Sequence, residues 1–114
     1  FDDALASRFL GCWLAEPSNL SVFEPPADPV IDLVSDWPEG GYLELDRRSR
    51  MLYRGKQLFI NGETAAVAAH PALRALADAR QLQCGDPRCR KLGEDERECL
   101  TDWLDSGWLH YRQA

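Results

Sequence analysis

Hydrophobic residues near the N-terminus recur at helical spacing. Leu5, Phe9, Cys12 and Trp13 stand at i, i+4, i+7 and i+8, which places their side chains along one stripe of a helix. The pattern predicts an amphipathic helix over residues 2–15. Its stripe either faces the core of this domain or, if the helix is the tail of a preceding domain, forms an exposed apolar patch. Pro17 ends it, because the residue before a proline disfavours helical backbone.

Prolines then punctuate residues 16–29. They are Pro17, Pro25, Pro26 and Pro29. No helix can run across Pro25-Pro26, so the segment is predicted to be an extended, proline-rich strap. Val22 and Phe23 are the apolar residues expected to pin this strap to a surface.

A short apolar-periodic segment follows the strap over residues 30–37. Its apolar positions are Val30, Ile31, Val34 and Trp37. Asp28 is a suitable N-cap and Pro29 suits the first helical position, so a short helix is predicted. Pro38 stops this helix, and Gly40-Gly41 turns the chain.

Three short strands are predicted next. They begin at Tyr42, Met51 and Leu58, and a charged turn over residues 46–50 separates the first two. Asn61-Gly62 is the strongest local signal, because it supplies both positive-φ positions of a type I′ turn. Residues 57–67 are therefore predicted to form a β-hairpin.

The C-terminal half alternates helix and strand signals. His70-Pro71 opens a predicted helix that runs to about Leu82, with its apolar stripe at Leu73, Leu76 and Ala77. Residues 84–93 are predicted to be a loop. A second helix is predicted to start at Asp95, with Glu98 completing a capping box, and to end at Gly107. Its inward positions are Cys99, Leu100, Trp103 and Leu104, and residues 108–111 form a closing strand.

This order predicts an α+β fold in which helices pack on a short antiparallel sheet. A helix and a proline-rich strap precede the domain. The arrangement is compatible with a small winged-helix-like domain, and the Asn61-Gly62 hairpin takes the position of the wing.

Charge is unevenly distributed over the 114 residues, whose formal net charge is −6. Ten of the thirteen basic residues lie between residues 46 and 92, and five of them form a cluster: Arg47, Arg48, Arg50, Arg54 and Lys56. A basic patch on a winged fold is compatible with nucleic-acid binding. The acidic flanks would be repelled by phosphate, so pairing with the protein's own surface or with a neighbouring domain is favoured.

Membrane insertion and secretion are not expected. The longest apolar run has five residues, from Ala65 to Ala69, whereas a membrane span needs about 20. The chain shows no signal peptide and no initiating Met, so we expect a piece of a larger cytoplasmic protein with reduced thiols.

No residue is assigned a catalytic, cofactor-binding or metal-binding role. Cys84, Cys89 and Cys99 are the weak candidates for a zinc site, but their spacing is wider than the usual Cys-x₂-Cys pair. The two histidines, His70 and His110, are expected to serve helix initiation and packing. No nucleophile elbow and no glycine-rich phosphate loop occurs.

An ordered set of motifs resembles the C-terminal region of bacterial ribosomal oxygenases, which are JmjC-type cupin proteins similar to ribosomal protein arginine hydroxylases. The motifs are Trp13, Phe23-Glu24-Pro25-Pro26, Leu58-Phe59-Ile60-Asn61-Gly62-Glu63, Pro71-Ala72-Leu73 with Leu76-Ala77, and Asp105-Ser106-Gly107-Trp108. The resemblance covers nearly the whole chain. It implies that residues 1–15 end a dimerisation region, residues 16–29 link it, and residues 30–114 form a winged-helix-like C-terminal domain.

The resemblance also implies a function. The chain would be a non-catalytic accessory domain of an Fe(II)- and 2-oxoglutarate-dependent protein hydroxylase that acts on a ribosomal protein. Iron and 2-oxoglutarate would bind in a JmjC/cupin barrel outside this chain. Its partners would be that barrel and the dimerisation domain of a homodimeric parent, and no nucleic acid. The alternative is a free-standing winged-helix domain that binds nucleic acid or acts as an adaptor.

Overall fold

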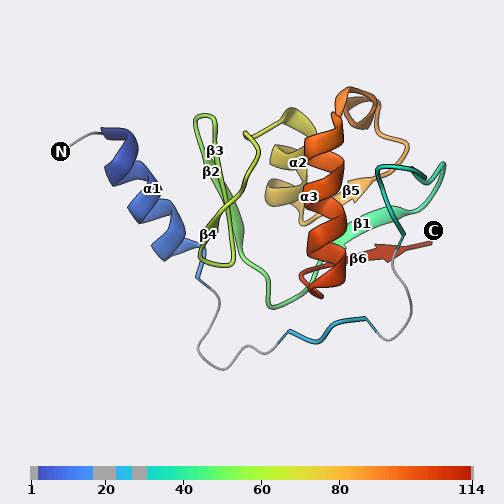
Figure 1. Ribbon diagram of the computed structural model, residues 1–114, viewed down its shortest axis with the longest axis horizontal. Helices are drawn as coiled ribbons and strands as arrows, with labels where there is room; N and C mark the ends of the chain where they lie inside the picture. The colour runs from blue at the N-terminus through green and yellow to red at the C-terminus, as the bar shows by residue number, and fades with distance from the viewer. Residues whose placement is uncertain (1–2, 17–22, 27–30, 114) are drawn as a thin grey trace.

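The computed structural model describes residues 3–16, 23–26 and 31–113 (Figure 1). Helix α1, Asp3–Leu14, confirms the predicted N-terminal helix. Most of the predicted strap lies outside the described residues, as do Val22 and the N-cap candidate Asp28. Phe23 is described, and its ring lies 6.1 Å from that of Trp108, so this residue of the strap packs on the domain as predicted.

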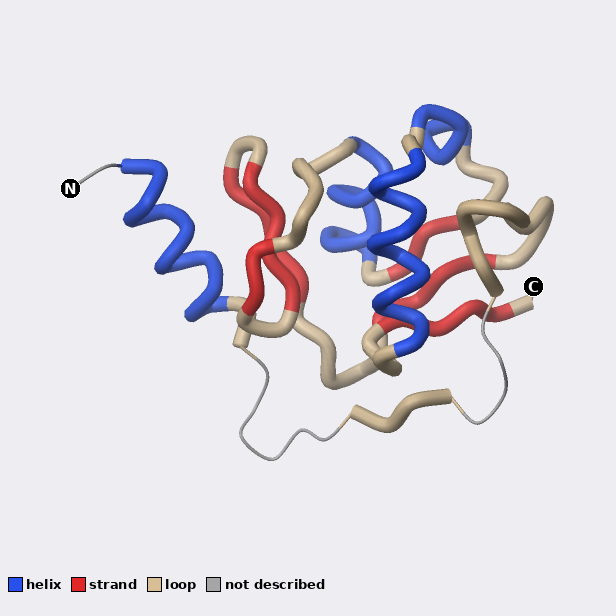
Figure 2. Tube along the Cα trace, viewed as in Figure 1, coloured by secondary structure: helices blue, strands red, loops and turns tan. Residues whose placement is uncertain are grey.

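The predicted single sheet is instead two three-stranded antiparallel sheets (Figure 2). In the first, β1, Tyr42–Leu45, lies between β5, Gln81–Gln83, and β6, Leu109–Arg112. The second contains β2, Met51–Arg54; β3, Gln57–Ile60; and β4, Glu63–Thr64. The single-sheet prediction was wrong because β1 pairs with strands far along the chain rather than with its neighbour β2.

The hairpin prediction is confirmed by the turn between β3 and β4. Asn61 and Gly62 have φ values of 49° and 83°, and Ile60 pairs with Glu63 across the turn. Asparagine and glycine are the residues that adopt positive φ most readily. The local sequence therefore set the position of this turn.

Helix α2, Pro71–Ala79, begins where His70-Pro71 predicted but ends earlier than Leu82. Arg80 adopts left-handed backbone with φ 63°, and the chain then enters β5. The guanidinium of Arg80 donates to the carbonyl oxygens of Asp46 and Ser49 at 2.9 and 2.8 Å. The left-handed backbone of Arg80 ends the helix, and Leu82 then pairs with Leu43 in the sheet.

The predicted short helix at residues 30–37 is absent from the described residues, where 33–35 form only a turn. Side chains take the backbone N–H groups that a helix would use. Leu33 N donates to Thr101 Oγ1 at 3.0 Å, and Val34 N donates to Asp32 Oδ1 at 3.0 Å. Such side-chain acceptors compete with helical hydrogen bonds.

Two further helical segments cover the C-terminal half. The predicted loop at 84–93 contains a short 3₁₀ helix, η1, Pro87–Lys91, capped by the Asp86 side chain. Helix α3, Glu94–Asp105, has Gly93 as its N-cap, without a side-chain cap hydrogen bond. The predicted capping box at Asp95 was therefore wrong, because Asp95 lies in the first turn, where acidic residues favour the helix dipole. The predicted stop at Gly107 is confirmed by its φ of 76°.

The core lies between the two sheets, α2 and α3. Leucines from every one of these elements are buried, among them Leu43, Leu58, Leu73 and Leu100. Helix α1 packs separately against β2, β3 and β4. This mixture of helices and short antiparallel sheets confirms the predicted α+β class.

Candidate functional site

The four cysteines are free thiols. Cys84 and Cys89 line one cavity, whereas Cys99 lines a different groove beside α3, so the three candidate zinc ligands do not converge. Burial raises the pKa of the Cys89 and Cys99 thiols to about 11, which leaves them protonated at neutral pH. Within the described part of the chain, no group of three His, Cys, Asp or Glu residues could hold a metal ion.

The histidines form structural hydrogen bonds. His70 caps α2, because its Nδ1 accepts from Ala72 N at 3.1 Å, while its Nε2 lies 3.2 Å from Lys91 O. This confirms the predicted role of His70 at the start of a helix. His110 Nε2 lies 2.8 Å from Asp46 Oδ2, a partner that sequence reasoning missed.

Asp46 is the centre of a polar network that the sequence did not predict. Its carboxylate is nearly buried and accepts from the backbone N and the Nε of Arg48, both at 2.9 Å, as well as meeting His110. The hydrogen bonds from Arg48 hold the pKa of Asp46 well below its usual range. The only sign of this pairing in the sequence is that Arg48 follows Asp46 by two residues in the turn.

The network continues through Ser49, which is 1% exposed. Ser49 Oγ donates to Trp108 O at 2.7 Å and accepts from Asn61 Nδ2 at 3.2 Å. These bonds join the turn after β1, the start of β6 and the hairpin turn of the second sheet. The network therefore holds the two sheets together, which is a structural rather than a catalytic task.

The basic cluster is divided in two by the structure. Arg48 pairs with Asp46, and its guanidinium lies 5.6 Å from the centre of the Phe23 ring. This arginine therefore binds the protein's own surface and strap, as the favoured interpretation predicted. The other four members are exposed and form no ion pair with another described residue: Arg47, Arg50, Arg54 and Lys56.

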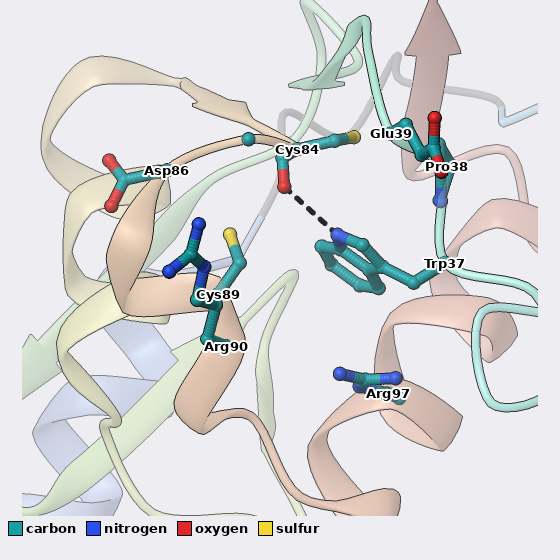
Figure 3. Close-up of a pocket in the computed structure, with 9 residues that line it drawn as sticks. Trp37, Pro38, Glu39, Cys84, Asp86, Cys89, Arg90 and Arg97 are labelled. Carbon is teal, nitrogen blue, oxygen red and sulfur yellow. Dashed lines mark hydrogen bonds between the residues drawn. The ribbon is translucent and has the colours of Figure 1, made fainter.

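A cavity of about 290 Å³ lies between residues 37–39, residues 84–90 and α3 (Figure 3). The Trp37 indole N–H donates to Cys84 O at 2.9 Å, and the Arg97 guanidinium lies 5.2 Å from the Trp37 ring centre. The Cys89 thiol, which lines the same cavity, donates to Gln83 O at 3.4 Å. Burial raises the pKa of the Cys84 and Cys89 thiols, so both stay protonated, and the indole N–H of Trp37 already donates to Cys84 O. These residues therefore pack against one another and provide no activated nucleophile.

An exposed apolar face on α1 is the clearest candidate interaction surface. Gly11 faces the Phe59 ring and Ala15 is fully buried, so this side of α1 packs on the second sheet. Leu10, Trp13 and Leu14 are 38%, 63% and 49% exposed. The exposure of Trp13 agrees with the prediction of an exposed apolar patch on this helix and not with the alternative of a core-facing position. Among the described residues, these are the exposed large hydrophobics, and such clusters mark interaction sites.

Comparison with known proteins identifies the fold. The model of a family described as ROXA-like winged helix matches residues 1–110. Comparison with curated proteins finds no match. The match confirms the winged-helix-like fold predicted for this chain.

Solved structures of the ribosomal oxygenase YcfD from Escherichia coli share this fold. One superposes with a TM-score of 0.77 and 22% identity, covering 96% of this chain and 31% of that chain. A complex with cobalt and 2-oxoglutarate superposes with a TM-score of 0.76 and 22% identity, covering 96% of this chain and 31% of that chain. A complex with cobalt and succinic acid superposes with a TM-score of 0.72 and 22% identity, covering 92% of this chain and 30% of that chain. The chain thus spans about a third of the length of these structures.

Proposed function

This chain belongs to the family of ROXA-like winged-helix domains, and we propose that it is the C-terminal accessory domain of a larger oxygenase. The whole protein would be an Fe(II)- and 2-oxoglutarate-dependent JmjC/cupin hydroxylase acting on a ribosomal protein. The observation that carries the proposal is the family match over residues 1–110. Its fold is shared with a ribosomal oxygenase solved with cobalt and 2-oxoglutarate.

The residues of this chain do not fit the iron or the 2-oxoglutarate of such an enzyme. Its two histidines are engaged with Lys91 and Asp46, and no metal-binding group of three occurs in the described ranges. A non-haem iron site needs two histidines and a carboxylate with open positions. The proposal therefore places both cofactors in a barrel outside this chain and gives the chain no catalytic residue.

The exposed apolar face of α1 supports a docking role. Residues 1–15 would complete a dimerisation region, residues 16–29 would connect it, and residues 30–114 would form the winged-helix-like domain. Leu10, Trp13 and Leu14 would then be covered by helices of the homodimeric parent. We place this parent in the cytoplasm, together with its proposed ribosomal protein substrate. None of the helices in the described ranges could span a membrane.

The first test is the intact mass of the natural protein and the sequence upstream of this chain. A longer protein with a His-x-Asp/Glu pair and a later His is expected. The purified protein should then add one oxygen atom to a ribosomal protein only when iron and 2-oxoglutarate are supplied, as measured by mass spectrometry. A natural chain of 114 residues would contradict the proposal.

The alternative of a free-standing nucleic-acid binder rests on the four exposed members of the basic cluster. It predicts salt-sensitive retardation of duplex DNA or RNA that is lost when Arg47, Arg50 and Arg54 are changed to Ala. Arg48 is left unchanged in this test, because it holds Asp46. We expect no retardation at low salt, since the net charge is −6.

A further inference from the structure

Phe23 is the residue at which the strap meets the winged-helix domain. Residues 23–26 are the short light-blue segment between two grey traces, below β6 in Figure 1. Phe23 is half-buried, whereas the three residues after it are exposed. Its ring centre lies 6.1 Å from that of Trp108, with an angle of 60° between the rings, and 5.6 Å from the Arg48 guanidinium. The ring therefore contacts an aromatic group and a cation together.

Side-chain contacts alone fasten this part of the strap. No backbone hydrogen bond joins residues 23–26 to another described residue. Pro25 and Pro26 have no N–H, and one of two consecutive residues in a strand must face the neighbouring strand. This stretch therefore cannot extend the sheet as a regular strand beside β6. It can leave the surface of the domain without breaking any hydrogen bond of the sheet.

The surface that receives the Phe23 ring is built by the domain itself. Arg48 is held by Asp46, whose carboxylate accepts from the Arg48 Nε at 2.9 Å. The Trp108 carbonyl oxygen accepts from Ser49 Oγ at 2.7 Å and from Asp46 N at 2.9 Å. Trp108 also packs against the core cluster, to which Phe23 does not belong. These contacts would keep the receiving surface in place when the ring leaves it.

Gly107 and Glu24 match the strap to this surface. A Cβ at Gly107 would overlap the backbone carbonyl of Glu24, so the strap approaches closely because residue 107 has no side chain. The hydrogen bond to Asp46, and to a smaller extent the Glu24 carboxylate, raise the pKa of the Arg48 guanidinium. Glu24 therefore adds electrostatic attraction beside the Phe23 ring.

We propose that Phe23 is a reversible latch, which closes the strap onto Trp108 and Arg48 and opens without unfolding the domain. Aromatic pairs and cation–π contacts each shift an equilibrium by about two- to tenfold, so the closed form dominates and the open form stays within reach. The role of the latch rests on the proposed function. In the parent it would limit movement between the dimerisation region and this domain, beside the contact of α1 with the second sheet.

The first test compares Phe23→Ala with the unsubstituted 114-residue chain by NMR at the indole N–H groups. The Trp108 indole should shift, because a neighbouring ring is removed, whereas the Trp37 indole, which donates to Cys84 O, should not. Amide protection in β1 and α3 should change by less than about twofold. An unmoved Trp108 indole would overturn the proposal. Loss of protection in β1 would overturn it too, because Phe23 would then be part of the core.

Proteolysis measures the opening of the latch. Thermolysin cleaves before apolar residues, and Leu20 offers such a site in the strap on the N-terminal side of Phe23. We expect Phe23→Ala to raise the rate of cleavage before Leu20 about fivefold or more. Phe23→Tyr is the matched control, because it keeps the aromatic ring and should stay within about twofold of the unsubstituted chain. An unchanged rate in Phe23→Ala, or an equal rise in both variants, would contradict a latch made by the ring.

The latch and the oxygenase assignment fail separately. Absence of the latch would leave the assignment standing, because the upstream sequence and oxygen transfer test that assignment. Conversely, a natural chain without an oxygenase barrel would leave the measured latch intact and remove only its role in the parent.

Discussion

Asp46 shows how one residue supports this fold. It is 6% exposed, yet its carboxylate is charged, because Arg48 and His110 donate to it within 2.9 Å. Its own backbone oxygen accepts from Arg80, which ends α2. A buried charge persists only when it is paired and hydrogen-bonded. The side chain of Asp46 therefore joins the turn after β1 to the closing strand, and its backbone oxygen joins that turn to the residue after α2.

We predict that Asp46→Asn lowers the free energy of unfolding at pH 7 by about 1–3 kcal/mol, because charged donors lose their acceptor. The pKa of Asp46 in the folded protein lies below that of the unfolded chain. Its stabilisation is therefore present above the ordinary carboxyl pKa and is lost as pH falls through the folded value. The difference in the free energy of unfolding between Asp46→Asn and the unsubstituted chain should therefore shrink as the pH falls.

Thermal unfolding at pH 7, 5 and 3 measures this effect. Asp36→Asn serves as the control, since Asp36 is exposed and its side chain forms no hydrogen bond with another described residue. The control variant should unfold at the same temperature as the unsubstituted chain at every pH. A constant difference between Asp46→Asn and the parent from pH 7 to pH 3 would contradict the assigned charge.

Among the elements, α1 packs closely against the second sheet, β2 to β4. Gly11 lies where a Cβ would overlap the ring of Phe59, which is fully buried and has no room to move. Cys12 Sγ lies 3.2 Å from Thr64 Oγ1 on the same side. The helix therefore approaches the second sheet closely only because residue 11 has no side chain.

We predict that Gly11→Ala displaces α1 while the two sheets remain folded. Overpacking of this kind costs about 1–3 kcal/mol. Hydrogen exchange should speed up in residues 3–16 by a larger factor than in β1 or α3. Gly40→Ala is the matched control, because a Cβ at Gly40 meets nothing within 4 Å. Uniform protection in both variants would show that α1 tolerates the added methyl group.

At the scale of the whole molecule, the exposed face of α1 contrasts with the well-packed domain beside it. Leu10, Trp13 and Leu14 gather on one helix, while Leu33, Leu43 and the other core leucines are covered. Exposed apolar surface drives association in water. The isolated chain therefore carries a surface that favours contact with another protein or with its own copy.

We predict that the 114-residue chain self-associates more strongly than a version that starts near Asp28. Sedimentation velocity over a range of concentrations measures this difference. Trp13→Ser should shift the full chain toward monomer, because it removes the most exposed of the three side chains. Identical sedimentation of the full and shortened chains would exclude α1 as the contact.

Features that local chemistry controls follow directly from the amino-acid sequence. Asn61-Gly62 set the hairpin turn, His70-Pro71 set the start of α2, and Gly107 set the end of α3. Each depends on the backbone preference of one or two residues. The ordered motifs also identified the family, since they extend over most of the chain.

Features that join distant residues arise only when the chain is folded. The pairing of β1 with β5 and β6, the early end of α2 at Arg80, and the bond between Asp46 and His110 all connect segments more than 30 residues apart. The groove beside α3, which Cys99 lines together with Glu63 of β4, likewise exists only once β4 lies beside α3. Periodicity reports which face of an element is apolar, but it does not report which partner covers that face.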